Sequence, residues 1–218
     1  MSDTATPRPD TSDMASVHKV FRSSLASAPD LVSSAAGDDE RRALIANYYA
    51  NLISFLESHH EGEEAIIFPR LAERAPAQRA VVDKAQSQHA QVVDLVHAAR
   101  HNVSVWETAG DDGAAGLVQS LQALSAALVP HLDEEEAVIV PLAGEYMTVE
   151  EWGMLPGHAL GTFGGDKVWL ILGLIRENFT PQQRDTMLEH MPPPARQMWE
   201  TMGEASFNDL IAEVRRSG

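Results

Sequence analysis

Two stretches of this chain align without a gap, and this repeat constrains the fold more than any other feature of the sequence. The first stretch covers residues 59–69 and the second covers residues 131–141. In each one, a histidine begins an acidic cluster that runs into an apolar segment. Two such clusters in the same register are difficult to explain as independent solvated helix faces. The matched pairs are His59 and His131, Glu63 and Glu135, Glu64 and Glu136, Ala65 and Ala137, Ile67 and Ile139, and Pro69 and Pro141.

The spacing within each copy predicts a pair of metal ligands on one helix face. Residues four apart lie one helical turn apart, so His59 and Glu63 project together. One such pair alone is weak evidence, because exposed helices often carry it as a solvated contact. The register favours His59 over His60 as the ligand, since Leu132 stands opposite His60. Helical phase also turns His60 by about 100° away from His59.

Composition limits the classes of function. The 218 residues carry a formal net charge of −16, which argues against nucleic acid and against an anionic membrane surface as partners. The chain has no cysteine, so disulfides, iron–sulfur clusters and thiolate zinc sites are excluded. The beginning of the chain lacks a basic-then-apolar signal pattern, and the longest apolar run, residues 168–175, is too short to span a bilayer. We expect a cytoplasmic protein.

Apolar periodicity and turn signals predict an all-α, up-down-up-down four-helix bundle with additional C-terminal helices. The expected bundle helices cover residues 12–36, 38–69, 77–106 and 114–141. Residues 1–11 are expected to be a disordered tail, residues 12–146 the bundle, and residues 147–218 a helical extension packed on it. That extension can also act as a lid over the site or as a dimer surface, and the sequence leaves the oligomeric state open.

Counting residues from each predicted turn shows which positions on neighbouring helices lie at the same height along the bundle axis. Six residues lie at one height. In an antiparallel bundle, residues equally far from a turn lie side by side, and these six agree within about four residues, or ~6 Å. His97 and His101 lie ~12–18 Å further along the third helix and are assigned to structure or surface. The six candidate metal ligands are His18, His59, Glu63, His89, His131 and Glu135.

Four histidines and two carboxylates buried in a core are costly unless they are paired, and two metal ions would remove this cost. Imidazole and carboxylate suit iron, manganese or zinc. The set contains more imidazole than bundles built on Glu-x-x-His motifs. A less anionic site favours redox-active iron that binds a small molecule, with zinc or manganese less favoured.

The order lone His, His-x-x-x-Glu, lone His, His-x-x-x-Glu, with proline six residues after each Glu, resembles the hemerythrin-like HHE cation-binding domains over residues 12–145. The resemblance implies an oxo- or hydroxo-bridged di-iron centre held by the six candidates, with Glu63 and Glu135 as bridges. Arg22, one turn after His18, resembles the arginine that follows the first ligand in many members.

The chain also departs from the oxygen-carrying members of that family. They have His-x-x-x-His in the third helix, whereas Ala85 and Val93 flank His89, so a fifth histidine is missing. They have an aspartate ligand in the fourth helix, where this chain has Glu135. His60 is a further candidate for the missing ligand. Glu64 and Glu136 are expected on the solvated face or beside the ligands.

Three functions are compatible with this pattern. A site with one imidazole fewer favours reaction with peroxide or nitric oxide over reversible O2 carriage, as in a catalase-like or nitric-oxide-reacting enzyme. The second is a module that senses O2 or iron without turnover. The third, a helical interaction protein without metal, is disfavoured by the repeat.

Overall fold

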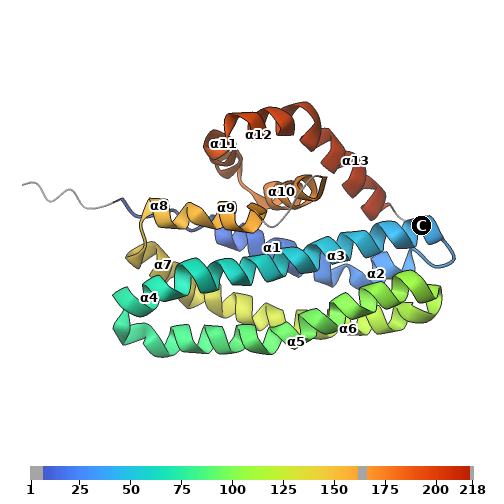
Figure 1. Cartoon of the computed structure of the whole chain (residues 1–218), viewed down its shortest axis with the longest axis horizontal. Helices are drawn as coiled ribbons and strands as arrows, with labels where there is room; N and C mark the ends of the chain where they lie inside the picture. The colour runs from blue at the N-terminus through green and yellow to red at the C-terminus, as the bar shows by residue number, and fades with distance from the viewer. Residues whose placement is uncertain (1–6, 162–165, 217–218) are drawn as a thin grey trace, which may run out of the picture.

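The computed structural model describes residues 7–161 and 166–216, and every regular element in them is a helix. Four long helical rods pack into a bundle. The remaining helices lie along one side of it (Figure 1). The predicted all-α bundle with additional C-terminal helices is therefore confirmed. Of the predicted disordered tail, residues 1–6 lie outside the described residues.

Each rod of the bundle is built from more than one helical element. The four rods are α1 (Asp13–Ala26) with α2 (Ala28–Ser33); α3 (Asp39–Gly62) with η1 (Glu63–Ile67) and α4 (Phe68–Arg74); η2 (Pro76–Gln78) with α5 (Arg79–Ala109); and, after η3 (Gly110–Gly113), α6 (Ala114–Glu134) with η4 (Glu135–Ile139) and α7 (Val140–Tyr146).

The first rod is two helices and not the single helix predicted for residues 12–36. Pro29 has no N–H to donate to the carbonyl of Leu25, and its ring would clash with that carbonyl. Helix α1 therefore ends at Ala26, and α2 begins with Pro29 in its first turn. The chain then turns at Gly37, whose φ of 71° is favourable only for glycine among common residues. Asp38 caps α3 by accepting a hydrogen bond from the backbone N–H of Arg41 at 3.0 Å.

Two π-helical turns, η1 and η4, occupy the same place in the two copies of the repeat. Pro69 and Pro141 lack the N–H that an α-helix needs, so the preceding hydrogen bond shifts by one residue. The N–H of Phe68 bonds to the carbonyl of Glu63, and the N–H of Val140 bonds to the carbonyl of Glu135. The second rod consequently continues to Arg74 as a helix with a π-turn, beyond residue 69 where the second bundle helix was expected to end.

A polar layer crosses the bundle and divides its core into two hydrophobic clusters. In every rod, the segment that carries the candidate ligands lies between a residue of the smaller cluster and a residue of the larger cluster. The flanking pairs are Met14 and Val20, Ile66 and Leu56, Ala85 and Val92, and Ile139 and Leu128. This packing buries the layer on both sides and fixes its height in all four rods.

The stretch Pro76–Tyr146 contains a window with a mean hydropathy of 1.2, which meets a length-and-composition criterion for membrane-spanning helices. In the structure this stretch folds back on itself as the third and fourth rods and carries His89 and His131 into the polar layer. Core helices of soluble bundles meet the same criterion, so the match is weak evidence for a membrane helix.

The C-terminal extension packs on the bundle and contributes to its larger cluster through residues such as Trp169, Leu170 and Phe207. Thr148 and Thr180 form the capping boxes that begin α8 and α11, with Glu151 and Gln183 as their partners. The helices are α8 (Val149–Trp152), α9 (Met154–Gly161), α10 (Asp166–Asn178), α11 (Pro181–His190), α12 (Pro193–Met198), η5 (Trp199–Gly203) and α13 (Glu204–Arg215).

The contact between Asp13 and Trp152 ties α8 to the first rod, and the burial of Asp13 makes stability depend on pH. The Trp152 indole N–H donates to the Asp13 carboxylate at 3.1 Å. Burial raises the pKa of Asp13 from 3.8 to about 6, against the lowering effect of that hydrogen bond. Because the pKa is higher in the folded chain, Asp13 lowers the free energy of unfolding as pH rises from about 4 to about 6.

We expect Asp13→Asn to raise the free energy of unfolding at pH 7 by about 1 kcal/mol, since the amide oxygen still accepts from Trp152 but carries no charge. This figure is discounted for partial exposure and for the lost attraction to the α1 N-terminus. Urea denaturation at pH 4 and pH 7 measures it. Asp10→Asn is the control, because hydrogen bonds from Ser12 lower the pKa of Asp10. An equal gain at both pH values would contradict the argument.

Candidate metal centre

The six predicted ligands lie together in the polar layer, and a seventh side chain, His60, joins them. All seven are buried: Glu63 and Glu135 are each 1% exposed, and His60, the most accessible, is 8% exposed. They come from all four rods, because the turns bring the four segments to one height, as the sequence predicted. Their nitrogen and oxygen atoms form two neighbouring groups suited to metal ions.

The first lobe of the centre, which we define as His18, His59 and the carboxylate oxygens facing them, lies between the first and second rods. Ligand atoms of His18, His59, Glu63 and Glu135 all lie within 4.8 Å of one another. The His59 ring packs on Phe21 with a centroid distance of 5.3 Å, so one wall of this lobe is apolar.

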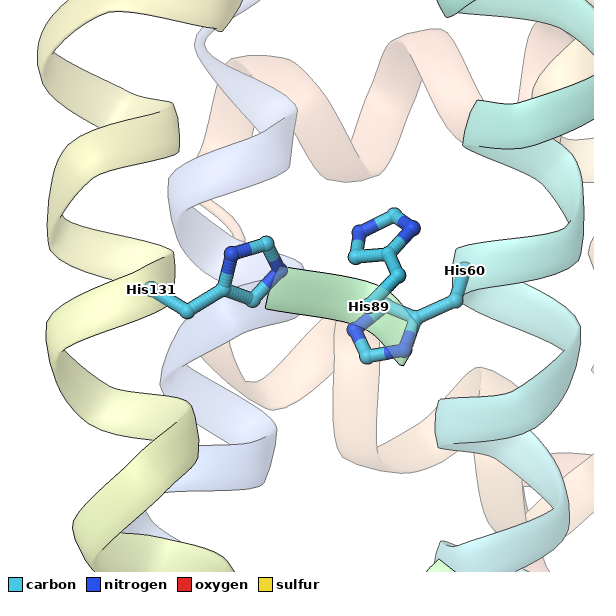
Figure 2. Close-up of side chains that lie close together, drawn as sticks. All are labelled: His60, His89 and His131. Carbon is cyan, nitrogen blue, oxygen red and sulfur yellow. The ribbon is translucent and has the colours of Figure 1, made fainter. Parts of the chain in front are cut away.

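The second lobe is formed by His60, His89 and His131, whose ligand atoms also lie within 4.8 Å of one another. Figure 2 shows the three side chains directed toward one another from three different helices. The His60 ring is stacked on that of His89 at a centroid distance of 4.1 Å, and the His89 and His131 rings meet edge to face at 4.8 Å.

Glu63 presents one carboxylate oxygen to each lobe. Its Oε1 lies 3.6 Å from His59 Nε2 in the first lobe. Its Oε2 lies 3.4 Å from His89 Nε2 in the second lobe. A carboxylate divided in this way is placed to bridge two cations.

Glu135 is divided between the lobes in the same way. Its Oε2 lies 3.7 Å from His18 Nε2. Its Oε1 lies 3.4 Å from His89 Nε2 and 3.3 Å from His131 Nε2. The repeat thus supplies two equivalent carboxylates that link one lobe to the other.

Most of the inward-facing atoms have no hydrogen-bond partner in the part of the chain that the structure describes. Buried polar atoms are nearly always hydrogen-bonded, and leaving several unpaired in one place is unfavourable. Nitrogen and carboxylate oxygen donors that converge without partners fit a cation site. The unpartnered atoms are Nε2 of His18, His59, His60 and His131, together with Oε2 of Glu63 and Glu135.

Acceptors outside the lobes orient three imidazoles through their Nδ1 atoms. His18 Nδ1 donates to Glu136 at 2.9 Å, and His89 Nδ1 donates to Glu64 at 3.1 Å. Carboxylates accept only, so each Nδ1 carries a proton toward its acceptor and Nε2 is the atom directed into the lobe, as in most metal-binding histidines. The glutamate that follows Glu63 and the one that follows Glu135 therefore each orient a histidine on another rod.

His131 is oriented through Gln88, which the sequence reasoning did not consider. The Gln88 side chain accepts from His131 Nδ1 at 3.2 Å and donates to Glu134 at 3.0 Å. Lys84 also donates to Glu134, at 2.5 and 2.7 Å. This series of hydrogen bonds is visible only in the structure, because it depends on how α5 packs against α6. In the sequence, Gln88 is simply the residue before His89.

Arg22 lies one turn after His18 and outside the first lobe. It donates to Glu136 at 2.6 Å and to Asp133 at 2.7 Å. Hydrogen bonds from His18 and Arg22 lower the pKa of Glu136 and keep this carboxylate ionised. Arg22 therefore stabilises the group that orients His18.

The electrostatics of the layer keep most imidazoles neutral and able to bind a cation. Burial lowers the pKa of His131 to about 4 and holds the pKa values of His59 and His60 well below 6.5. Burial, followed by repulsion from Glu135, raises the pKa of Glu63 to about 8. Although burial opposes it, hydrogen bonding to Glu135 and Glu63 raises the pKa of His89 to about 10. A cation bound between these carboxylates would take the place of that proton.

His60 lies inside the cluster, although the register and the helical phase turned it away. The residue that follows the first histidine of the repeat is buried in both copies: it is His60 in the first copy and Leu132 in the second. Helical phase does not expose His60, because α3 is buried around much of its circumference by the other rods and by α9, α10 and α13. The second lobe gains a third imidazole, whereas the second copy of the repeat has an apolar side chain there.

The other histidines lie outside the two lobes. His97 and His101 are exposed on α5, in agreement with their assignment to structure or surface. His190 is exposed and donates from Nδ1 to the carbonyl of Thr186 at 2.8 Å. His158 of α9 packs against the backbone of Gly62, where an added Cβ would lie 3.3 Å from the imidazole ring.

Helices α8 and α9 hold the segment that carries Glu63 from outside the bundle. Glu151 pairs with Arg74 at 2.7 Å and with Arg70 at 3.1 Å on α4. Ser58 of α3 donates to the carbonyl of Ala159 at 3.3 Å. The extension thus covers the outer side of α3 next to the candidate ligands.

The comparison with protein families agrees with this geometry. The chain matches the model of the hemerythrin HHE cation binding domain over residues 10–143. No protein of curated function and no solved structure matches the chain significantly. The matched region contains all seven buried side chains of the two lobes and ends before the C-terminal extension. The chain belongs to the hemerythrin HHE cation-binding family, and its buried histidines and glutamates are suited to a metal site.

Proposed function

We propose that the protein is a non-haem di-iron protein that binds or reacts with small oxidants: hydrogen peroxide, O2 or nitric oxide. Its ligands are His18, His59, Glu63, His89, His131 and Glu135, with His60 as the seventh. One observation supports this proposal above all others. Glu63 and Glu135 each direct one oxygen to each lobe, and a site for a single ion would not need this division.

Iron fits the donor set better than the alternatives. Seven donors of mixed imidazole and carboxylate type suit two ions that change oxidation state, whereas structural zinc is almost always held by four ligands in a closed tetrahedron. Bound iron would supply the electrons for reduction of an oxidant. The chain's own residues would hold the ions, orient the imidazoles and exclude bulk water.

The two lobes differ, and we place the exogenous ligand at the first. Two imidazoles and two carboxylate oxygens face the first lobe, whereas three imidazoles and two carboxylate oxygens face the second. A metal ion with fewer protein donors has more coordination positions open to an exogenous ligand. Phe21 packs on His59 beside this lobe and makes part of its wall apolar.

The alternative is a module that senses O2 or iron without turnover. The contact of Gly62 with α9 favours it, because Gly62 precedes Glu63 directly and His158 packs against it. A displacement of Glu63 on metal or ligand binding would reach the C-terminal helices through this contact.

Metal analysis tests the proposal. Protein expressed in iron-supplemented medium should contain about two irons per chain, with near-ultraviolet charge-transfer bands. Turnover of peroxide or nitric oxide would then separate an enzyme from a sensor. Protein that contains one zinc without such bands, or no metal, would overturn the redox proposal.

Loss of His60 should weaken the second lobe. We expect His60→Ala to lower iron affinity at least about 10-fold and to shift the charge-transfer bands, because an imidazole donor is removed. Titration with ferrous iron under anaerobic conditions measures the affinity. His190→Ala is the matched control, since His190 is exposed on α11. An unchanged affinity and spectrum in His60→Ala would show that His60 is only a packing residue.

A further inference from the structure

The exposed face of α5 carries two histidines that the buried centre does not use. His97 and His101 lie one turn apart in the uninterrupted helix Arg79–Ala109, and both are exposed. Helix α5 lies on the side of the bundle away from the C-terminal helices (Figure 1). Within residues 7–161 and 166–216, no hydrogen bond or ion pair holds either imidazole. Both side chains are therefore free to turn toward a shared ligand.

Their spacing is suited to chelation. Residues four apart on a helix have Cβ atoms about 5–6 Å apart, so two imidazoles can hold one ion between them. Zinc-binding helices with two histidines at this spacing use the same geometry. Single exposed histidines such as His190 lack this second donor.

The surroundings of the pair favour a cation. Asp94 is exposed, lies one turn before His97 and has no partner among the described residues, so it can accept the second N–H of that imidazole. Arg100, the nearest cationic side chain on α5, pairs with Glu57 of α3. The net charge of −16 raises the local concentration of cations further.

We propose that His97 and His101 form a surface site for one late first-row divalent cation of the Cu2+ or Zn2+ class, separate from the buried centre. Two imidazoles with water at the other positions select these borderline ions over Mg2+ or Ca2+, which prefer oxygen ligands. His97 follows His89 by eight residues, or ~12 Å along the helix, so the two sites share no ligand.

Titration of the full-length protein with Cu2+ tests this site, with calorimetry for the stoichiometry and electron paramagnetic resonance for the nitrogen ligands. The wild type should bind one more Cu2+ per chain than the double variant His97→Ala/His101→Ala. The lost signal should show coupling to two nitrogens. Both proteins keep the buried centre intact, so the difference does not depend on whether that centre takes iron. The iron contents should be equal.

A spacing control separates chelation from adventitious binding to single histidines. His101→Ala/Ser104→His keeps the number of exposed histidines but places them seven residues apart, because Ser104 is also exposed. It should bind Cu2+ about 100-fold more weakly than the wild type, since the second donor no longer adds its effective concentration. His190→Ala should bind as the wild type does. Equal stoichiometry in the wild type and the double variant, or equal affinity in the spacing control, would overturn the proposal.

Discussion

Glu135→Gln is expected to reduce the iron content from about two per chain to one or none and to weaken iron binding more than about 100-fold. This loss of iron affinity exceeds the 10- to 100-fold loss that is typical when a group that only hydrogen-bonds to a metal ligand is replaced. The physical reason is that one carboxylate serves both lobes, with Oε2 3.7 Å from His18 and Oε1 3.3 Å from His131. An amide removes the negative charge from both lobes at once and turns an N–H2 group toward one of them.

The metal-free form of the same variant should keep its stability within about 1 kcal/mol of the metal-free wild type. The substitution removes the repulsion between two buried carboxylates, and Glu63 still lies 3.4 Å from His89 as its partner. Thermal unfolding after chelation measures this. The matched control is Glu145→Gln, the same substitution at an exposed position on α7. A metal-free variant that unfolds several degrees lower would identify Glu135 as a structural group and not a ligand.

Arg41→Ala is expected to lower the free energy of unfolding by about 3 kcal/mol and the Tm by about 6–12 °C. Arg41 is only 5% exposed and makes no ion pair in the part of the chain that the structure describes. Its guanidinium donates to the carbonyls of Glu213 at 2.9 Å, Val214 at 3.2 Å and Arg216 at 2.6 Å. The negative end of the α13 dipole adds to this attraction. The variant would leave those carbonyls without their donor.

Hydrogen exchange should locate the damage in α13, since Arg41 fastens this helix to the start of α3. Iron content should not change, because Arg41 precedes His59 by eighteen residues, or ~27 Å. Arg41→Lys should recover only part of the loss, since an ammonium cannot reproduce the planar fork. The control is Arg42→Ala, which should cost less than about 1 kcal/mol because its partners Asp39 and Asp111 are both largely exposed. Equal effects at the two arginines would contradict the anchoring role.

Features that depend only on residues close together in the sequence, such as the start of a helix, could be predicted from the sequence. The expected starts of the second and fourth bundle helices, residues 38 and 114, agree with the N-cap Asp38 of α3 and with the first residue of α6, since a helix start depends on residues three or four apart. Pro29 was overlooked as a local signal and divided the first rod. The π-turns were also missed, because proline at positions 69 and 141 is compatible with an end, a kink or a widened turn.

The location of the site was also accessible from the sequence. The repeat of His-x-x-x-Glu, with lone histidines at matching heights, predicted which six side chains share a layer. This worked because helix rise is constant and the turns between the rods are short. The structure brings all six together.

The sequence by itself determined the four rods, the height of the polar layer and the family, since these follow from periodicity and from the spacing within the repeat. Only the tertiary structure decided how the layer divides into two lobes, that His60 turns into the second, and that Glu64 and Glu136 orient His89 and His18. These features depend on how each helix is rotated about its axis and on which rod it faces. Spacing along one helix carries no information about either, because packing between rods sets them.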